Sequence, residues 1–154
     1  MTTSAGILLY RHGNAGLEVF LVHPGGPYWA RKDAGAWSIP KGECDSVEAD
    51  LLAEARREFR EETGHPIDGA FQPMQPIRQA GGKTVHAWAV EGALDADQLR
   101  SNTFKMEWPP RSGKQCEFPE VDRGAWFSLA EAGARILPSQ RPLLEQLRTI
   151  VQSR

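Results

Sequence analysis

The stretch from Asp50 to Gly64 constrains this chain most, because it has the marks of a helix with defined ends. It contains no Pro, and no Gly before Gly64, and it is rich in Ala, Leu and charged residues. Apolar residues recur at three- and four-residue steps, at Leu51, Leu52, Ala55 and Phe59. Asp50 is a candidate N-cap, and Gly64 stands where a left-handed residue would end the last turn. We predict an amphipathic helix here.

Three glutamates share one side of this predicted helix. At about 100° per residue, Glu61 and Glu62 fall within roughly 60° of Glu58. Like charges at these spacings repel, and the helix dipole disfavours anions in the last turn. Composition leaves two interpretations open. The stripe is either a solvated charged face steadied by nearby arginines, or a site for a hard cation such as Mg²⁺, which binds carboxylates together with substrate phosphates.

The spacing around the helix resembles the Nudix box. That box runs Gly, five residues, Glu, seven residues, Arg-Glu, an apolar residue, any residue, Glu-Glu, any residue, Gly and an apolar residue. Its positions are filled here by Gly42, Glu48, Arg57-Glu58, Phe59, Glu61-Glu62 and Gly64. The dense second half, which carries the acidic stripe, matches throughout.

Two positions depart from the box. Eight residues, not seven, separate Glu48 from Arg57, and His65 occupies the final apolar position. An extra residue is cheap to accommodate in a loop, whereas inside the helix it would rotate the acidic stripe. We therefore place it in the loop before the helix. The extra residue puts in question the role of Glu48, which usually pairs with the box arginine in the family. It does not affect the metal ligands.

The resemblance implies a single domain over residues 1–154 with an α/β/α sandwich fold, in which a mixed β-sheet lies between the box helix and the C-terminal helices. It also implies an enzyme, a pyrophosphohydrolase that uses Mg²⁺ or Mn²⁺ to direct water at a phosphorus of a diphosphate. The implied metal ligands are Glu58, Glu61 and Glu62, with the backbone carbonyl of Lys41. Arg57 would orient the glutamates by ion pairing.

The resemblance leaves the general base open. Residues 118–127 resemble the closing strand of many Nudix hydrolases, and in the family an acid from this region can join the metal shell or act as base. Glu117 and Glu120 are the nearest acids. The base is therefore one of Glu61, Glu62, Glu117 or Glu120. Asp122 is instead a candidate turn or capping residue.

Residues 36–42, which lead into the box, resemble the Trp-x-x-Pro-Lys-Gly entry of the diadenosine tetraphosphate hydrolase kind of Nudix enzyme. This favours dinucleoside polyphosphates, such as diadenosine tetraphosphate, as substrates. Nucleoside triphosphates, ADP-ribose and nucleotide sugars are alternatives. A non-catalytic Nudix module that binds a nucleotide and regulates a partner is an alternative of another class, and the complete acidic stripe argues against it.

Two further segments carry candidate substrate contacts. After Pro24-Gly25-Gly26-Pro27, a loop presents Trp29 and Arg31, which could stack on a base and neutralise phosphate, or simply cap the edge of the core. Residues 95–113 are polar without clear periodicity, so we predict a long loop that covers the site, with Arg111 and Lys114 near phosphate. Packing of that loop on the core is the alternative. The Lys41 side chain is a third candidate for phosphate.

The remaining elements follow from apolar periodicity. They are strands at 5–10, 17–22, 75–79 and 84–90, with helices at 128–137 and 139–152. His23 follows an apolar strand and is expected to be structural. His86 and Trp88 share the mixed face of the strand at 84–90, where they either line a cleft or meet a second packed layer.

Composition limits the partners. The 154 residues carry a formal net charge of −2 with no block of Lys or Arg, which makes nucleic acid an unlikely partner and favours a small-molecule nucleotide. The N-terminus lacks a basic region and a long apolar run, so we expect no membrane anchor and a cytoplasmic protein. Two cysteines are too few for a disulfide scaffold. A homodimer is compatible with all of this.

Overall fold

The computed structural model describes residues 2–44, 50–79 and 81–153. Its strands are β1 (Thr3–Gly13), β2 (Gly16–Pro24), β3 (Lys41–Cys44), β4 (Gln72–Pro73), β5 (Ile77–Gln79), β6 (Lys83–Glu91), β7 (Thr103–Glu107), β8 (Gln115–Pro119) and β9 (Val121–Ser128). Its helices are α1 (Leu51–Thr63), α2 (Leu129–Arg135) and α3 (Arg141–Gln152), with short 3₁₀ turns η1 (Ala96–Gln98) and η2 (Pro138–Gln140). None of these helices is long and apolar enough to span a bilayer.

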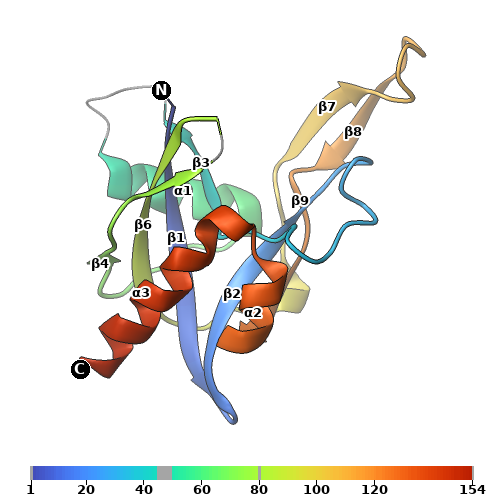
Figure 1. The fold of residues 1–154 in the computed structure, drawn as a ribbon. Coiled ribbons are helices and arrows are strands. Elements are labelled where there is room, and N and C mark those ends of the chain that lie inside the picture. The colour runs from blue at the N-terminus through green and yellow to red at the C-terminus, as the bar shows by residue number, and fades with distance from the viewer. Residues whose placement is uncertain (1, 45–49, 80, 154) are drawn as a thin grey trace.

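A mixed sheet forms the centre of the fold. Its main path is β4-β6-β1-β2-β9, with β3 added beside β1 and β5 beside β6. The β1–β6 pair is parallel and the other pairs are antiparallel. The helix α1 covers one face, and α2 and α3 cover the other (Figure 1). The α/β/α sandwich expected from the sequence is confirmed.

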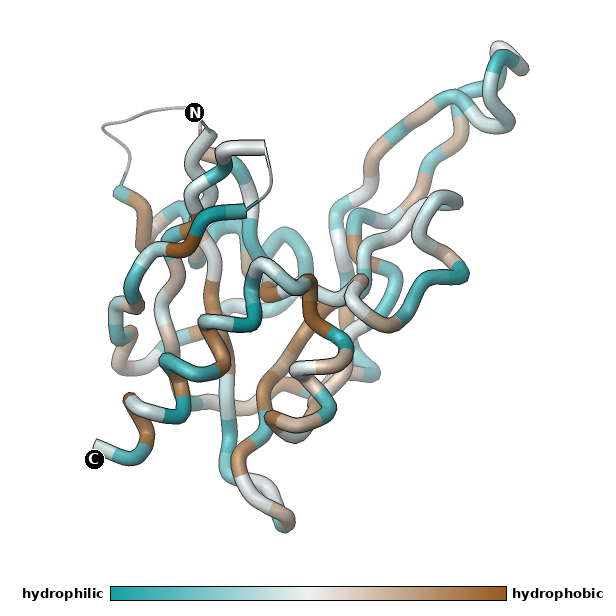
Figure 2. Tube along the Cα trace, in the orientation of Figure 1, coloured by the Kyte–Doolittle hydropathy of each residue, from teal (hydrophilic) through white to brown (hydrophobic). Residues whose placement is uncertain are grey.

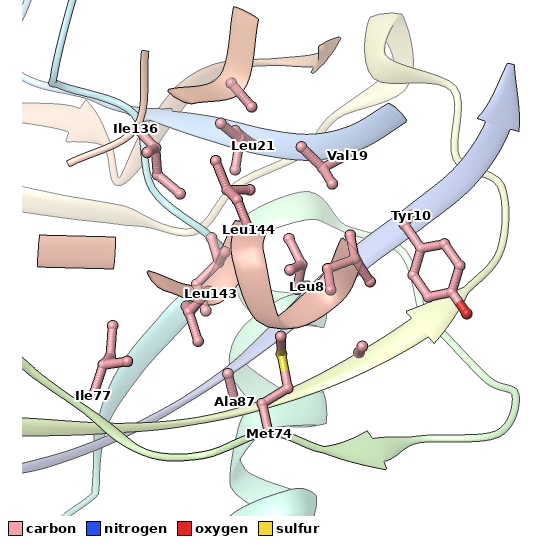
Figure 3. Close-up of a cluster of buried hydrophobic side chains, with 14 of the residues drawn as sticks. Leu8, Tyr10, Val19, Leu21, Met74, Ile77, Ala87, Ile136, Leu143 and Leu144 are labelled. Atoms are coloured by element: carbon pink, nitrogen blue, oxygen red, sulfur yellow. The ribbon is translucent and has the colours of Figure 1, made fainter. Parts of the chain in front are cut away.

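The strand β1 divides the core in two, because successive side chains of a strand point to opposite faces. Leu8 and Tyr10 join the cluster beneath α2 and α3, whereas Ile7 and Leu9 join the cluster beneath α1. Figure 3 shows Leu143 and Leu144 of α3 gathered with Leu8 in the first cluster. Hydrophobic positions recur between hydrophilic ones along α3, as Figure 2 shows. Both helical layers are therefore held by apolar burial.

The helix α1 has the ends expected from the sequence. The Asp50 side chain accepts a hydrogen bond from the backbone N–H of Ala53, and Gly64 ends the helix with a φ of 79°. Ala55 and Phe59 are buried against the sheet. Glu58 and Glu62 stand at about 100° and about 60° from Phe59 around the helix, so they lie at the edge of the buried face.

The segment predicted as a long loop, residues 95–113, is different in the structure. It contains the turn η1 and the strand β7, which pairs with β8 in a separate two-stranded ribbon. Figure 1 shows this ribbon projecting from the main sheet. Exposed and half-buried residues alternate along β7, with Phe104 opposite Phe118. Phe104 and Met106 alternate with polar residues along β7, which is a strand signal that the mostly polar composition of residues 95–113 obscured.

Other predicted strands are shorter in the structure or begin at a different residue. The strand at 75–79 begins at Ile77, and the closing strand begins at Val121 because Phe118 and Pro119 belong to β8. Trp88 packs against the α1-side cluster, which fits the second-layer interpretation.

His23 is structural, as expected. Its ring is fully buried, with Nδ1 2.8 Å from Asp122 Oδ1 and Nε2 2.6 Å from the Lys32 carbonyl oxygen. Asp122 is therefore the partner of a buried histidine and not a turn or capping residue. The contact ties β9 to the loop that carries Trp29.

Candidate active site

The acidic stripe of α1 lies against β3. Gly42 packs so closely on Glu58 that a Cβ added to Gly42 would overlap the Glu58 carboxyl group. The Glu58 side chain is only 13% exposed. The strand β3 reaches this position by pairing with the start of β1, where Gly42 is opposite Ala5. The glycine that opens the box therefore makes room for a carboxylate.

Arg57 engages three carboxylates around it. Its guanidinium donates to Glu54 Oε2 at 2.6 Å, to Glu58 Oε1 at 3.1 Å and to both Glu61 oxygens at 2.9 Å. The hydrogen bond with Glu54 is the main reason that the Arg57 pKa is raised above its usual value. Arg57 thus holds like charges together that would otherwise repel.

Negative charge accumulates at the last turn of α1. Burial raises the pKa of Glu62 to about 8, with help from the charges of Glu58 and Glu120 and in opposition to Lys41. Burial also raises the pKa of Glu58, where Arg57 opposes it. The pKa of Glu120 is raised by burial and by Glu61. These carboxylates are close enough to resist joint ionisation, which is the electrostatic environment that a bound cation relieves.

The donor chemistry of this cluster fits a hard divalent cation, since its side chains offer carboxylate oxygens. Within residues 2–44, 50–79 and 81–153, however, no three acidic, imidazole or thiol side chains are gathered tightly enough to hold a metal ion as they stand. Arg57 donates to Oε1 of Glu58 and to both oxygens of Glu61, and Glu58 Oε2 makes no hydrogen bond with Arg57. Each carboxylate oxygen can accept a second contact. Cation binding at this site would therefore need these side chains to move closer together, with Arg57 still in contact with them.

A cleft with a volume of about 240 Å³ opens beside the cluster. Its charged lining residues are Lys41, Glu62 and Glu120. The rest of its wall is mostly apolar and consists of Val22, Pro24, Trp29, Ala36, Ser38, Ile39, Val121 and Leu137. Burial, and then the charge of Lys83, lower the pKa of Lys41. An apolar cleft with a few convergent charged groups is the usual form of a small-molecule site.

The structure brings only some of the predicted site residues to this cleft. Trp29, Lys41, Glu62 and Glu120 line it, whereas Arg31 lies exposed in the Trp29 loop without lining it. Their roles remain predictions.

Three other predicted residues belong to the projecting ribbon. Glu117 is opposite Lys105 between β7 and β8. Arg111 and Lys114 are exposed near the tip, where the backbone φ of Arg111 is 63°. Figure 1 shows this tip pointing away from α1. Glu48, the box residue that usually pairs with the arginine in the family, lies outside the described residues.

Sequence reasoning did not find Ser38, Val121 and Leu137, which also line the cleft. They carry no distinctive chemistry. A bridge to Val22 places Ser38 at the cleft, and the bridge between Trp37 and Ile136 brings the neighbouring Leu137 to it. Only the pairing of distant segments could have identified them.

A mixed sheet between helices, with an acidic helix end beside a cleft, defines an α/β/α domain with a candidate small-molecule site. Comparison with protein families gives the particular family, because the NUDIX domain model matches residues 1–147. The chain therefore belongs to the Nudix family. Comparison with curated protein sequences gave no significant match.

Solved structures share this fold at low sequence identity. A Caenorhabditis elegans Ap4A hydrolase binary complex has a TM-score of 0.68 and 18% identity, with 100% of both chains covered. The NUDIX domain of Shewanella oneidensis NrtR with ADP ribose has a TM-score of 0.66 and 16% identity, covering 97% of this chain and 87% of that one. A MutT structure from a study of Aliivibrio salmonicida and Vibrio cholerae has a TM-score of 0.56 and 16% identity, covering 94% and 93%.

Proposed function

We propose that this chain is a divalent-metal-dependent pyrophosphohydrolase that cleaves a diphosphate linkage in a nucleotide derivative. The observation that carries the proposal is the meeting of two features in one cleft. Glu62 and Glu120, whose pKa values are raised, line the same cavity as Lys41 and Trp29. A diphosphate bound there would face acids that can bind a cation or accept a proton, next to a wall that suits a base.

In this proposal Glu58, Glu61 and Glu62 would hold the ion, with the backbone carbonyl of Lys41. Bound Mg²⁺ or Mn²⁺ supplies charge neutralisation and lowers the pKa of a bound water. Arg57 acts as a positioning residue, because it contacts Glu58 and Glu61 directly.

The general base is best sought at the cleft. Glu62 lines the cleft, and burial raises its pKa to about 8 in the metal-free protein. A bound cation would lower this pKa again, so Glu62 is a candidate base by its position. Glu120 is the second candidate, since it lines the cleft from the corner between β8 and β9. Glu61 and Glu117 stay possible by the resemblance alone, and neither lines the cleft.

For substrate we propose dinucleoside polyphosphates such as diadenosine tetraphosphate. The proposal is supported by the Trp37 to Gly42 entry segment, by the structural likeness to an Ap4A hydrolase and by Trp29, on which a base could stack. Nucleoside triphosphates, ADP-ribose and nucleotide sugars are the alternatives. A cytoplasmic location and a homodimer stay expectations of the sequence.

A regulatory nucleotide-binding module is the second candidate. The observation in its favour is that no three candidate ligands are gathered around a metal position among the described residues, while Arg57 engages Glu54, Glu58 and Glu61. A NUDIX domain solved with ADP ribose is among the structural neighbours. Such a module would bind a nucleotide without turnover.

The test is product analysis with diadenosine tetraphosphate, nucleoside triphosphates, ADP-ribose and nucleotide sugars, with Mg²⁺ and with chelator. Wild type is compared with Glu61→Gln and with the control Glu145→Gln on the exposed side of α3. We expect metal-dependent cleavage that Glu61→Gln abolishes and Glu145→Gln retains. Absence of turnover, with a nucleotide still raising the melting temperature, would favour the regulatory module.

A further inference from the structure

The root of the β7–β8 ribbon, which projects from the main sheet in Figure 1, connects the acidic end of α1 with the cleft. The chain enters β7 through residues 100–102 and leaves β8 through Glu120, which lines the cleft. The main-chain amide of Glu120 donates to the Asn102 carbonyl at 2.8 Å. The entering and leaving segments of the ribbon are therefore joined directly at Glu120.

The entering segment also closes the C-terminal end of α1. The last carbonyl groups of a helix have no partner within the helix, so they must bind another group. The Asn102 N–H donates to the Glu61 carbonyl at 2.7 Å, and the Arg100 N–H donates to the Thr63 carbonyl at 2.8 Å. These bonds fix the segment against the end of the helix that carries the acidic stripe.

The Ser101 hydroxyl ties the same segment to the chain on either side of the Glu120–Val121 peptide. Its oxygen accepts from the N–H of the buried Val121 at 2.9 Å, and it donates its proton to the Asn102 carbonyl at 2.6 Å. The main-chain amides of Glu120 and Val121 are thus both bound to this one segment. Ser101 supplies a side chain to a joint whose other hydrogen bonds connect backbone groups.

The carbonyl side of Glu120 is held by the loop that carries Trp29. The Gly25 N–H donates to the Glu120 carbonyl at 2.9 Å. Gly25 also lies so close to Pro119 that a Cβ added to Gly25 would overlap the Pro119 carbonyl. Glu120 is therefore fixed at both its amide and its carbonyl group.

A carboxylate at this position needs such support. Glu120 faces the negative charges of Glu61 and Glu62, and like charges drive carboxylates apart. Arg57 pairs with Glu61, whereas no cationic side chain among the residues that the structure describes forms an ion pair with Glu120. The hydrogen bonds of the backbone joint therefore oppose this repulsion.

We propose that Ser101 is a positioning residue, which holds Glu120 at the cleft by fixing the main chain of Glu120 and Val121 to the end of α1. The proposal rests on the proposed function for the role of Glu120 at the diphosphate. It deepens that function by assigning the geometry of this acid to a residue outside the Nudix box.

The kinetic test uses diadenosine tetraphosphate, or whichever panel compound is cleaved in its place. Ser101→Ala should lower kcat about tenfold at similar KM, because a catalytic acid or base contributes about 10²- to 10⁴-fold and is here displaced, not removed. Ser101→Thr keeps the hydroxyl and should recover most of the loss. Ser112→Ala is the matched control and should keep wild-type values, since the Ser112 hydroxyl also accepts a backbone N–H, from Lys114 at 3.2 Å, but at the ribbon tip.

Action through Glu120 is tested by combining Ser101→Ala with Glu120→Gln. Two residues that act through one group have effects that are not additive. Ser101→Ala should therefore lower kcat about tenfold in the wild type and by less than about twofold in the Glu120→Gln background. An equal reduction in both backgrounds, or an unchanged kcat in Ser101→Ala alone, would overturn the proposal.

Amide hydrogen exchange followed by NMR keeps this inference separate from the proposed function, since it needs neither metal nor substrate. In Ser101→Ala the amides of Glu120 and Val121 should exchange about tenfold faster, while those of the buried strand β1 keep wild-type rates. This result would support the positioning of Glu120 even if no compound were hydrolysed. Unchanged exchange at Val121, or equal acceleration throughout the chain, would reject it even if the hydrolase were established.

Discussion

The carboxyl group of Glu58 lies where the side chain of residue 42 would begin, and only a glycine at that position leaves the space. Gly42 is not among the glycines with a positive φ, so close approach and not backbone conformation accounts for it. The box glycine and a box glutamate are thus one structural unit formed by β3 and α1.

Gly42→Ala should displace Glu58 and reduce kcat/KM about 100-fold, because a displacement of about an ångström is enough to misplace a catalytic group. The matched control is Gly133→Ala in α2, where an added Cβ meets nothing within 4 Å. It should retain full activity and gain a little stability from helix propensity. Steady-state kinetics on both variants measures the effect. Wild-type activity in Gly42→Ala would contradict the role proposed for Glu58 at the site.

Arg57→Ala should weaken the apparent affinity for the activating metal by about 10- to 100-fold, as expected for a residue that orients ligands. The reason is that Glu54, Glu58 and Glu61 lose their shared donor and repel one another. Arg57→Lys keeps the charge but not the fork of donors, so it should recover only part of the loss. Metal titrations of activity measure this. An unchanged metal dependence in Arg57→Ala would show that the ion pairs are incidental.

Metal-free stability should fall as pH rises, because Glu62 has a folded-state pKa of about 8 against an ordinary value of 4.5. Between these values the folded state binds more protons than the unfolded state, so rising pH favours unfolding, by at most about 1.4 kcal/mol per pH unit. Glu62→Gln should remove most of this slope, whereas the exposed Glu145→Gln should not.

Urea unfolding of the metal-free protein at about pH 5.5 and about pH 7.5 measures this slope. Addition of Mg²⁺ should restore stability at the higher pH, where the carboxylates are ionised. If the stability of the wild type did not fall with pH, and Glu62→Gln had the same pH dependence as the wild type, Glu62 would ionise normally.

Asp122→Ala should destabilise the protein by about 1–3 kcal/mol, because it leaves a ring nitrogen of the fully buried His23 without a partner. Asp122→Asn keeps an acceptor oxygen and should cost less. Thermal unfolding of the three proteins tests the order. Since the other His23 nitrogen meets the Lys32 carbonyl, limited proteolysis should also show faster cleavage of the Trp29 loop in Asp122→Ala.

Trp29→Ala should raise the KM for nucleotide substrates about 5- to 150-fold, which corresponds to the roughly 1–3 kcal/mol attributed to stacking of one base. Its neighbour Tyr28 is 58% exposed and packs on Trp108 without lining the cleft. Tyr28→Ala is therefore the control and should leave the KM unchanged. Similar KM values for all three proteins would assign Trp29 to packing alone.

The elements that could be predicted from sequence are those with strong local signals. The helix α1 combines an N-cap at Asp50, a left-handed Gly64 and a regular apolar face, so local energetics determine it. The spacing of Glu58, Glu61 and Glu62 on that helix follows directly. In contrast, residues 95–113 were predicted as a loop, although Phe104 and Met106 alternate with polar residues, because that alternation covers only five residues within a mostly polar segment.

By itself, the sequence determined the family, the box helix and the chemical types of the candidate ligands, since all three depend on residues that are neighbours along the chain. Only the tertiary structure decided which distant groups meet. It brought Glu120 and Lys41 to Glu62, joined Asp122 to His23 and Val121 to Ser101, while it left Arg111 on the ribbon. The physical reason is that strand register and core packing set these distances, and such long-range pairings leave no periodic signal in any one segment.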